Sequence, residues 1–209
     1  MAATDDLTWL AGRVDLTLLA PGVRAEDVRR GVDTVRELGL RGLVLAPSHL
    51  GLIGEGVHAA VVVGFPTGRP HTLIKAAEAR LAVAGGAEEV WLVPDPVEED
   101  GNVLLAEIVA VREAVPSPVV LGVVVEAAAR RDIGTVRRMA RVAGADRLIT
   151  ATGWHPEGVT DTAVVGECAG DLPVTALGTG LALDDAVSWL GAGADRLAVD
   201  HPGWLRAPG

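Results

Sequence analysis

The stretch Ala143-Gly144-Ala145-Asp146-Arg147-Leu148-Ile149-Thr150-Ala151-Thr152-Gly153 joins the end of one helical pattern to the whole of the strand pattern that follows it. Gly144 stands where a helix must stop with a positive φ angle, and the apolar, branched residues after it predict a buried strand. The same punctuation occurs in Gly85-Gly86-Ala87-Glu88 and in Ala192-Gly193-Ala194-Asp195. We therefore expect three connections in which a glycine ends a helix directly before the next strand.

Apolar, β-branched runs alternate with helical patterns along the rest of the chain, which is typical of a parallel sheet with helical crossovers. Eight strands are expected, at residues 14–19, 42–46, 59–64, 89–93, 119–125, 147–152, 173–177 and 196–199. Between them we expect a short turn at 48–56 and helices at 25–38, 72–84, 101–114, 133–143, 161–169 and 183–191. The pattern predicts an α/β fold, a compact (β/α)8 TIM barrel.

The domain organisation expected from the sequence is a single barrel over residues 1–209. No linker or low-complexity stretch suggests a second domain. Residues 1–12 form an N-terminal segment before the first strand, and residues 201–209 form a tail rich in proline and glycine. Such a tail is expected to pack only loosely against the barrel.

Composition and charge exclude several classes of protein. Hydrophobic residues make up 49% of the chain and charged residues 22%, which favours a packed globular domain. The formal net charge of -10 opposes binding to nucleic acid or anionic lipid. No apolar run reaches the roughly 18 residues that a spanning helix needs, and the start lacks the basic segment of a signal peptide. Cytoplasmic residence is the default expectation, and the single Cys168 cannot form an internal disulfide.

Several motifs, in order along the chain, resemble those of the class I deoxyribose-phosphate aldolases. Glu126 matches the glutamate that ends the family's fifth strand, and residues 143–153 resemble its A-G-A-D-x-x-K-T-S-T-G segment. Three further motifs are similar to the family's D-x-T-L-L, N-P-S and G-F-P-x-G: Asp15-Leu16-Thr17-Leu18-Leu19, Ala46-Pro47-Ser48 and Gly64-Phe65-Pro66-Thr67-Gly68. The resemblance runs from Val14 to Pro202, implies the same barrel, and is compatible with a homodimer, which the family often forms.

The departures from the family pattern fall on the positions that carry its chemistry. Ile149 stands where the family has its imine-forming lysine, and Thr175 stands where a second lysine lowers the pKa of the first. Gly122 replaces a strand-five lysine, and Trp91 replaces a strand-four aspartate. An aliphatic side chain can neither form an imine nor carry a proton. The resemblance therefore implies the barrel of an aldolase without its covalent mechanism.

The phosphate-binding end of the family's site is also altered. Asp200-His201 occupies positions where the family offers serine and glycine to a phosphate, and Asp200 is expected to repel that anion. Cleavage of deoxyribose 5-phosphate is therefore not expected. The only lysine, Lys75, lies in the helix after strand three, and relocation of the imine to it is a separate possibility that borohydride trapping tests.

Alternation along the strands groups the inward-facing candidates of the remaining site. Asp15 and Glu126 are expected as an acid–base pair, with His155 or His201 and Thr175 orienting a carbonyl group. The expected walls of the substrate pocket are Thr17, Trp91, Asp95, Ile149, Thr152, Trp154, Thr175 and Asp200. Trp91 is also expected to fill the volume left by Gly122 on the neighbouring strand.

Each of these candidates has a plainer structural explanation. Asp15 could hydrogen-bond neighbouring strands, and Asp95, between two prolines, fits a turn better than catalysis. His155 fits a solvated loop, and Asp200-His201 fits a loop brace as well as an acid–base pair. The five histidines show no tight metal-ligand spacing, so no metal ion is expected, and the acid–base scheme requires no cofactor.

Two hypotheses about function follow from the sequence. The first is an enzyme related to the aldolases that uses acid–base chemistry on a small, non-phosphorylated carbonyl compound, with retro-aldol cleavage, dehydration or cyclisation as the outcome. The second is a catalytically inactive barrel that serves as a binding or partner subunit. An enzyme needs an open pocket that carboxylates reach, whereas an inactive barrel can let Trp91, Ile149 and Leu177 close it.

Overall fold

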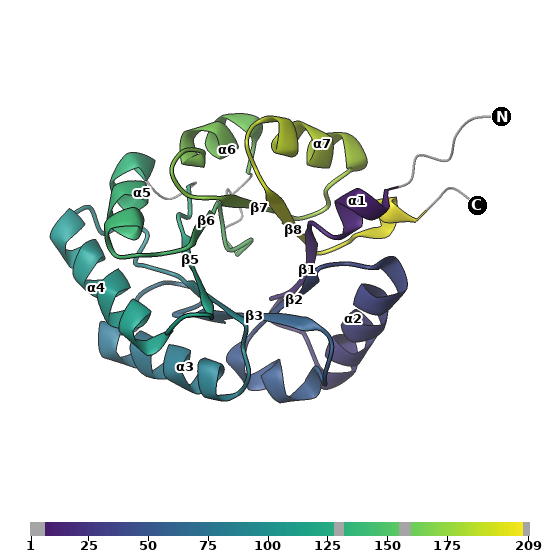
Figure 1. The fold of residues 1–209 in the computed structure, drawn as a ribbon, viewed down its shortest axis with the longest axis horizontal. Helices are drawn as coiled ribbons and strands as arrows, with labels where there is room; N and C mark the ends of the chain where they lie inside the picture. The colour runs from purple at the N-terminus through teal and green to yellow at the C-terminus, as the bar shows by residue number, and fades with distance from the viewer. Residues whose placement is uncertain (1–6, 128–131, 155–159, 207–209) are drawn as a thin grey trace.

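The computed structural model describes residues 7–127, 132–154 and 160–206 as a closed barrel of eight parallel strands (Figure 1). Each strand pairs with the next, and β1 pairs with β8 through the register of Asp15 with Ala198. The strands are β1 (Val14–Leu18), β2 (Gly42–Leu45), β3 (His58–Val63), β4 (Glu89–Leu92), β5 (Val120–Val124), β6 (Arg147–Ile149), β7 (Val174–Gly178) and β8 (Arg196–Val199). The predicted TIM barrel is confirmed.

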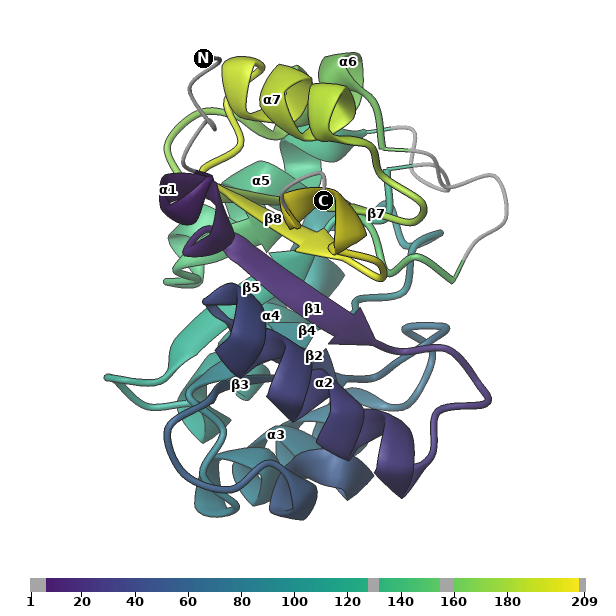
Figure 2. The ribbon, with the colours of Figure 1, turned by 90° about the vertical axis from the view of Figure 1, so that its right-hand side faces the viewer.

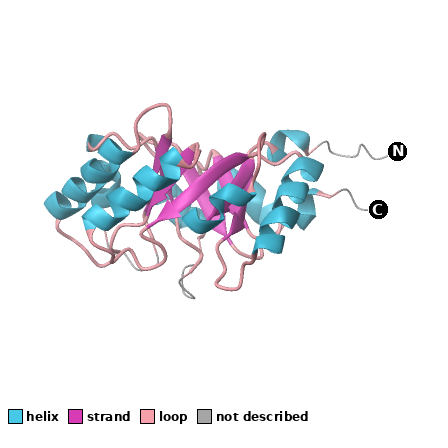
Figure 3. Cartoon of the chain, turned by 90° about the horizontal axis from the view of Figure 1, so that it is seen from below, coloured by secondary structure: helices cyan, strands magenta, loops and turns pink. Residues whose placement is uncertain are grey.

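Helices surround the barrel and carry the chain back to the start of the next strand (Figure 3). They are α2 (Ala25–Leu38), α3 (Thr72–Ala84), α4 (Gly101–Ala114), α5 (Ile133–Val142), α6 (Thr162–Cys168) and α7 (Leu183–Gly191). The crossover from β2 to β3 is the short 3-10 turn η1 (Pro47–Leu52), as the sequence predicts. In the described part of the chain, no helix combines the length and apolar character needed to cross a membrane.

The three glycine joints predicted from the sequence are confirmed. Gly86, Gly144 and Gly193 have φ angles of 96°, 76° and 115°, which a residue with a side chain rarely adopts. Each glycine lets the chain leave a helix and turn at once into the next strand. The helices can therefore stay in register with the strands although the connections are short.

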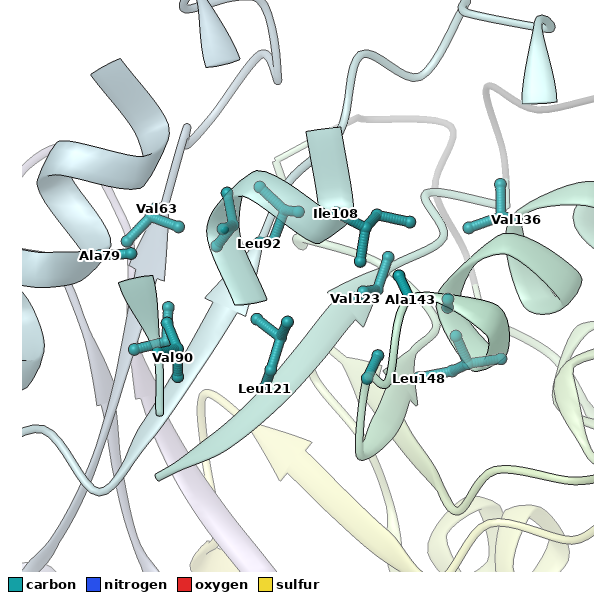
Figure 4. Close-up of a cluster of buried hydrophobic side chains, with 14 of the residues drawn as sticks. Val63, Ala79, Val90, Leu92, Ile108, Leu121, Val123, Val136, Ala143 and Leu148 are labelled. Atoms are coloured by element: carbon teal, nitrogen blue, oxygen red, sulfur yellow. The ribbon is translucent and has the colours of Figure 1, made fainter. Parts of the chain in front are cut away.

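Two apolar layers separate the barrel wall from the helices, and a third apolar cluster fills the barrel. Figure 4 shows part of one outer layer, in which Val123 of β5 lies close to Ile108 of α4. The cluster inside the barrel contains Val44, Ala60, Val62, Trp91, Val93, Val124, Ile149, Leu177 and Ala198. This interior is a packed core rather than a channel.

The chain termini differ from the sequence prediction. A short helix, α1 (Thr8–Ala11), precedes β1, and a 3-10 turn, η2 (Gly203–Leu205), follows β8. In Figures 1 and 2 the C-terminal turn lies beside α1, and Trp204 and Leu205 pack against the buried cluster that contains Leu10. The expectation of a loosely packed tail is therefore wrong for residues 202–205, because two large apolar side chains hold it against the barrel.

Candidate active site

A cavity of about 550 Å³ opens at the carboxyl ends of the strands, where barrel enzymes build their sites. Its wall includes apolar side chains, among them Leu19 and Leu177, and a small number of polar ones. Five of the site residues predicted from the sequence line it: Thr17, Thr152, Trp154, Asp200 and His201. The strand-end positions thus predict the location of the cavity. Leu177 joins its wall to the apolar cluster inside the barrel.

Phe65 and Thr179, which are not among the site residues predicted from the sequence, also line the cavity. The ring of Phe65 meets the ring of Trp154 edge to face, with centroids 5.6 Å apart and planes at 80°. Trp154 is 41% exposed, so this aromatic pair forms part of the rim. The G-F-P loop could have indicated Phe65, because it directly follows the end of β3.

The loop that carries Phe65 is clamped at both ends by α3. The backbone N–H of Gly64 donates to Glu78 Oε2 at 2.8 Å, and the Lys75 ammonium donates to the carbonyl of Gly68. A Cβ on Gly68 would overlap the carbonyl group of Pro94, and Gly68 has a φ angle of 69°. Glycine is therefore required where this loop passes the end of β4.

Lys75, the only lysine, is fully buried and does not line the cavity. Its Nζ pairs with Glu107 Oε1 of the neighbouring helix α4 and with the loop carbonyl named above. The amine thus binds α4 and the β3–α3 loop, outside the cavity. This position gives it no contact with a molecule in the mouth of the barrel.

Ile149 points into the barrel, where it is completely buried. A Cβ built on Gly122 would overlap Ile149 Cδ1 and would lie 3.1 Å from Trp91 Cδ1. The prediction that Trp91 fills the space at Gly122 is confirmed, and Ile149 fills it still more closely. The three residues form one interlocked apolar layer below the cavity.

Glu126 lies just behind the cavity wall, two residues after the end of β5. Its backbone has a φ angle of 53°, and the residue is only 2% exposed. Oε2 accepts a hydrogen bond from Thr152 N at 3.0 Å, whereas Oε1 has no hydrogen-bond partner among the described residues. A buried carboxylate oxygen without a partner, held by a strained backbone, is the kind of exception that marks functional sites.

Asp200 and His201 face the cavity from the loop after β8. Asp200 Oδ1 accepts a hydrogen bond from Gly180 N at 2.9 Å, and Oδ2 lies 3.1 Å from His201 Nδ1. The carboxylate therefore braces the loop after β7, while the His201 side chain is 83% exposed. The structure thus contains both arrangements considered from the sequence: a hydrogen bond that braces a loop, and a contact between the Asp200 and His201 side chains.

Asp15 lies at the other end of the barrel, near the amino ends of the strands. Both of its carboxylate oxygens are 2.8 Å from Nη1 of Arg41, which also binds Glu89. Burial raises the pKa of Asp15, and the charge of Arg41 offsets this only in part. Burial alone would also raise the pKa of Glu89, but the hydrogen bond with His58 and the charges of Arg41 and Arg147 lower it to about 2.

Thr175 and Trp91 take part in the same network at the base of the barrel. Thr175 Oγ1 accepts a hydrogen bond from Arg147 Nε at 2.9 Å, and Trp91 Nε1 donates to Glu89 Oε1 at 2.7 Å. The structure therefore does not bring Asp15 and Thr175 together with Glu126. This corrects the expected Asp15–Glu126 pair, because Asp15 and Glu126 lie at opposite ends of the barrel.

Two further candidates have plain placements. Asp95 Oδ1 accepts a hydrogen bond from Val97 N at 3.1 Å, and Oδ2 lies 3.6 Å from Arg69 Nε. This is the turn that the flanking prolines predict. His155 lies outside the described residues. In the ranges 7–127, 132–154 and 160–206, no group of three or more His, Cys, Asp or Glu residues is arranged to hold a metal ion.

No protein-family model matches the chain. A deoxyribose-phosphate aldolase of Corynebacterium glutamicum is 40% identical over 207 residues, covering 93% of each protein, and one of Nocardia farcinica is 41% identical over 199 residues, covering 91% of this chain and 90% of the relative. This chain belongs to the deoxyribose-phosphate aldolase family. The aldolase-type motifs around the strand ends are therefore inherited from this family.

Solved structures of this family have the same fold. The deoxyribose phosphate aldolase from Aeropyrum pernix, described as having a unique tetrameric structure, superposes with a TM-score of 0.84 at 30% identity, covering 96% of this chain and 94% of that one. An aldolase described as QR15 gives a TM-score of 0.83 at 29% identity, with 91% of both chains covered. The barrel of this aldolase-family chain is thus closely similar to those of solved aldolases.

Proposed function

We propose that this member of the aldolase family acts on a small carbonyl compound by acid–base chemistry and forms no Schiff base. Support comes from the two positions that decide imine formation. Ile149, at the position matched to the family's lysine, is buried in an apolar layer, and the only lysine is bound to Glu107 away from the cavity. Imine chemistry needs a free amine within reach of the carbonyl carbon.

Glu126 is the proposed base, and its buried, unpaired Oε1 is the single observation that carries the proposal. Thr152 N fixes the other carboxylate oxygen, and Thr152 lines the cavity. Because Glu126 does not itself line the cavity and Oε1 is buried, we propose in addition a rotation of its side chain that brings Oε1 to the carbon next to a bound carbonyl group, where it accepts a proton. The electron pair of the broken C–H bond moves into the carbonyl group, and the same carboxyl group can return the proton.

Thr17, Thr152 and His201 line the cavity that would hold the carbonyl group. A hydroxyl group or imidazolium can donate a hydrogen bond to the oxygen on which negative charge develops. His201, exposed at the rim, can in addition deliver a proton to a departing hydroxide, which would complete a dehydration. His155, which follows the sixth predicted strand in the sequence, stays a candidate for this second role.

Proton exchange tests the proposal without knowledge of the natural substrate. In deuterium oxide, the protein should exchange the protons next to the carbonyl group of propanal, followed by proton NMR. Glu126→Gln should lower the exchange rate by at least about 100-fold, because general-base catalysis is lost. Glu113→Gln, at an exposed position of α4, is the matched control and should exchange normally.

Borohydride treatment with the same aldehyde provides the second arm of this test. Peptide mass mapping should find Lys75 unmodified. A reduced adduct on Lys75 would overturn the non-covalent mechanism, and equal exchange rates for the Glu126→Gln variant and the wild-type protein would remove Glu126 from it.

The second candidate function is an inactive barrel that binds a ligand or partner. It is favoured by the closure of the barrel interior by Trp91, Ile149 and Leu177, the three residues expected to fill an inactive barrel. This closure stops at the floor of the cavity, which itself remains open. An inactive barrel predicts that small carbonyl compounds bind in the cavity but exchange no protons faster than in buffer.

A further inference from the structure

The Asp200 carboxylate accepts the hydrogen bond of a backbone N–H group that could otherwise bind an anion from a ligand. Its Oδ1 accepts the hydrogen bond of Gly180 N, in the turn that directly follows β7. Gly180 has a φ angle of 64° and follows Thr179, which lines the cavity. The loops after the seventh and eighth strands are where barrel enzymes frequently bind phosphate through backbone N–H groups. In this chain an internal carboxylate takes that place.

The other charged groups at the cavity wall offer an anion little attraction. Among the described lining residues, the ionisable side chains are Asp27, Asp200 and His201. Asp27 Oδ2 accepts a hydrogen bond from Arg24 N at 2.7 Å, which fixes its carboxylate at the start of α2. Arg30 pairs with the other oxygen of Asp27, so the repulsion that an anionic group meets in the cavity comes chiefly from Asp200, beside which His201 is the cavity-lining group able to carry a positive charge.

Asp200 also keeps capacity for a ligand of the opposite character. Its side chain is 30% exposed, and its oxygens make polar contacts with Gly180 N and with His201 Nδ1. A carboxylate offers about four acceptor sites, so Asp200 can accept further hydrogen bonds. A neutral hydroxyl group at the end of a substrate could donate one without bringing a charge.

We infer that Asp200 determines the substrate class of this cavity by acting as a built-in anion. It selects carbonyl compounds whose far end carries a neutral hydroxyl group and rejects their phosphate esters. The inference rests on the proposed function for the carbonyl end of the substrate. Its evidence, however, is the position of Asp200 on Gly180 N and the charge of the cavity wall, which are independent of Glu126.

Titration with inorganic phosphate tests the exclusion directly, by calorimetry on the resting protein. The wild-type protein should show no saturable binding at the cavity, whereas Asp200→Asn should bind phosphate at least about tenfold more tightly, because one charge repulsion is removed. Asp200→Ser, which also frees the amide of Gly180, should bind at least as well as Asp200→Asn. Asp33→Asn, at an exposed position of α2, removes the same charge and should leave phosphate binding unchanged.

A matched pair of sugars tests the selection. Deoxyribose should bind the wild-type protein more tightly than its 5-phosphate, and Asp200→Ser should reverse that order. Phosphate binding by the wild-type protein equal to that of both variants, or an order of the two sugars that Asp200→Ser leaves unchanged, would overturn the inference. Because neither titration requires turnover, a failure of the Glu126 exchange experiment would leave these results interpretable on their own.

Discussion

At the scale of single residues, the apolar packing inside the barrel couples neighbouring positions. Gly122, Ile149 and Trp91 occupy one layer, and the side chains of Ile149 and Trp91 fill the space beside Gly122. Any side chain at residue 122 would meet Ile149 Cδ1. A charged side chain at either position would also lose its hydration in an apolar surrounding. The identities of these three residues therefore depend on one another.

This coupling can be measured with two substitutions that act on a single atom. Gly122→Ala should destabilise the protein by about 1–3 kcal/mol, because its Cβ overlaps Ile149 Cδ1. Ile149→Val removes that same Cδ1 atom and should cost about 1 kcal/mol. The double variant should be clearly more stable than the sum of the two losses predicts. Urea unfolding of the four proteins measures the coupling, and simple additivity would contradict the interlocked layer.

At the scale of secondary-structure elements, α3 determines where the Phe65 loop lies. Lys75 and Glu78, one helical turn apart, bind the two ends of the loop. Lys75→Met should destabilise the protein by about 3 kcal/mol or more, because it leaves the buried Glu107 carboxylate without this cation. Lys75→Met combined with Glu107→Leu should recover part of the loss. Equal stability of Lys75→Met and the wild-type protein in urea unfolding would contradict the clamp.

Most element boundaries could be predicted from the sequence because local signals set them. Helices α2, α3, α4 and α7 begin and end where their patterns predict. Strand β6 is shorter than predicted: it ends at Ile149 because the Thr150 hydroxyl accepts the hydrogen bond of Leu177 N on the neighbouring strand. The helix α1 and the turn η2 span too few residues to show any periodicity.

The sequence predicts which side chains point into the barrel, but it does not predict how far along the barrel axis each of them lies. Alternation correctly places Asp15 and Thr17 on the inner side of β1, and only Thr17 reaches the cavity. Two residues along a strand advance the chain by about 6.6 Å, which separates the base of the barrel from its mouth. The partner that holds Asp15 at the base, Arg41, precedes β2 and belongs to no motif. Sequence periodicity contains no information about such a pairing.

At the scale of the whole molecule, charge is divided between the two ends of the barrel. The base contains a buried network in which Glu89 is within 4 Å of Arg41, Arg147 and Arg196. The mouth has carboxylates and a histidine with few cations among the described residues. Because the apolar layer around Ile149 lies between them, the base network can stabilise the fold while the mouth remains free to bind a ligand.

The base network predicts how stability depends on pH. The pKa of Glu89 is lowered to about 2 from 4.5, so its contribution of about 3 kcal/mol is complete above pH 4.5 and is lost as the pH falls toward 2. The pKa of Asp15 is raised, so Asp15 acts in the opposite direction: its contribution is complete below 3.8 and is lost as the pH rises through its folded value. Glu89→Gln should therefore lower stability at pH 7 and flatten its decline in acid, whereas Asp15→Asn should make that decline steeper. Urea unfolding followed by circular dichroism between about pH 3 and 7 measures both slopes, and three parallel curves would show that neither carboxylate is linked to folding in this way.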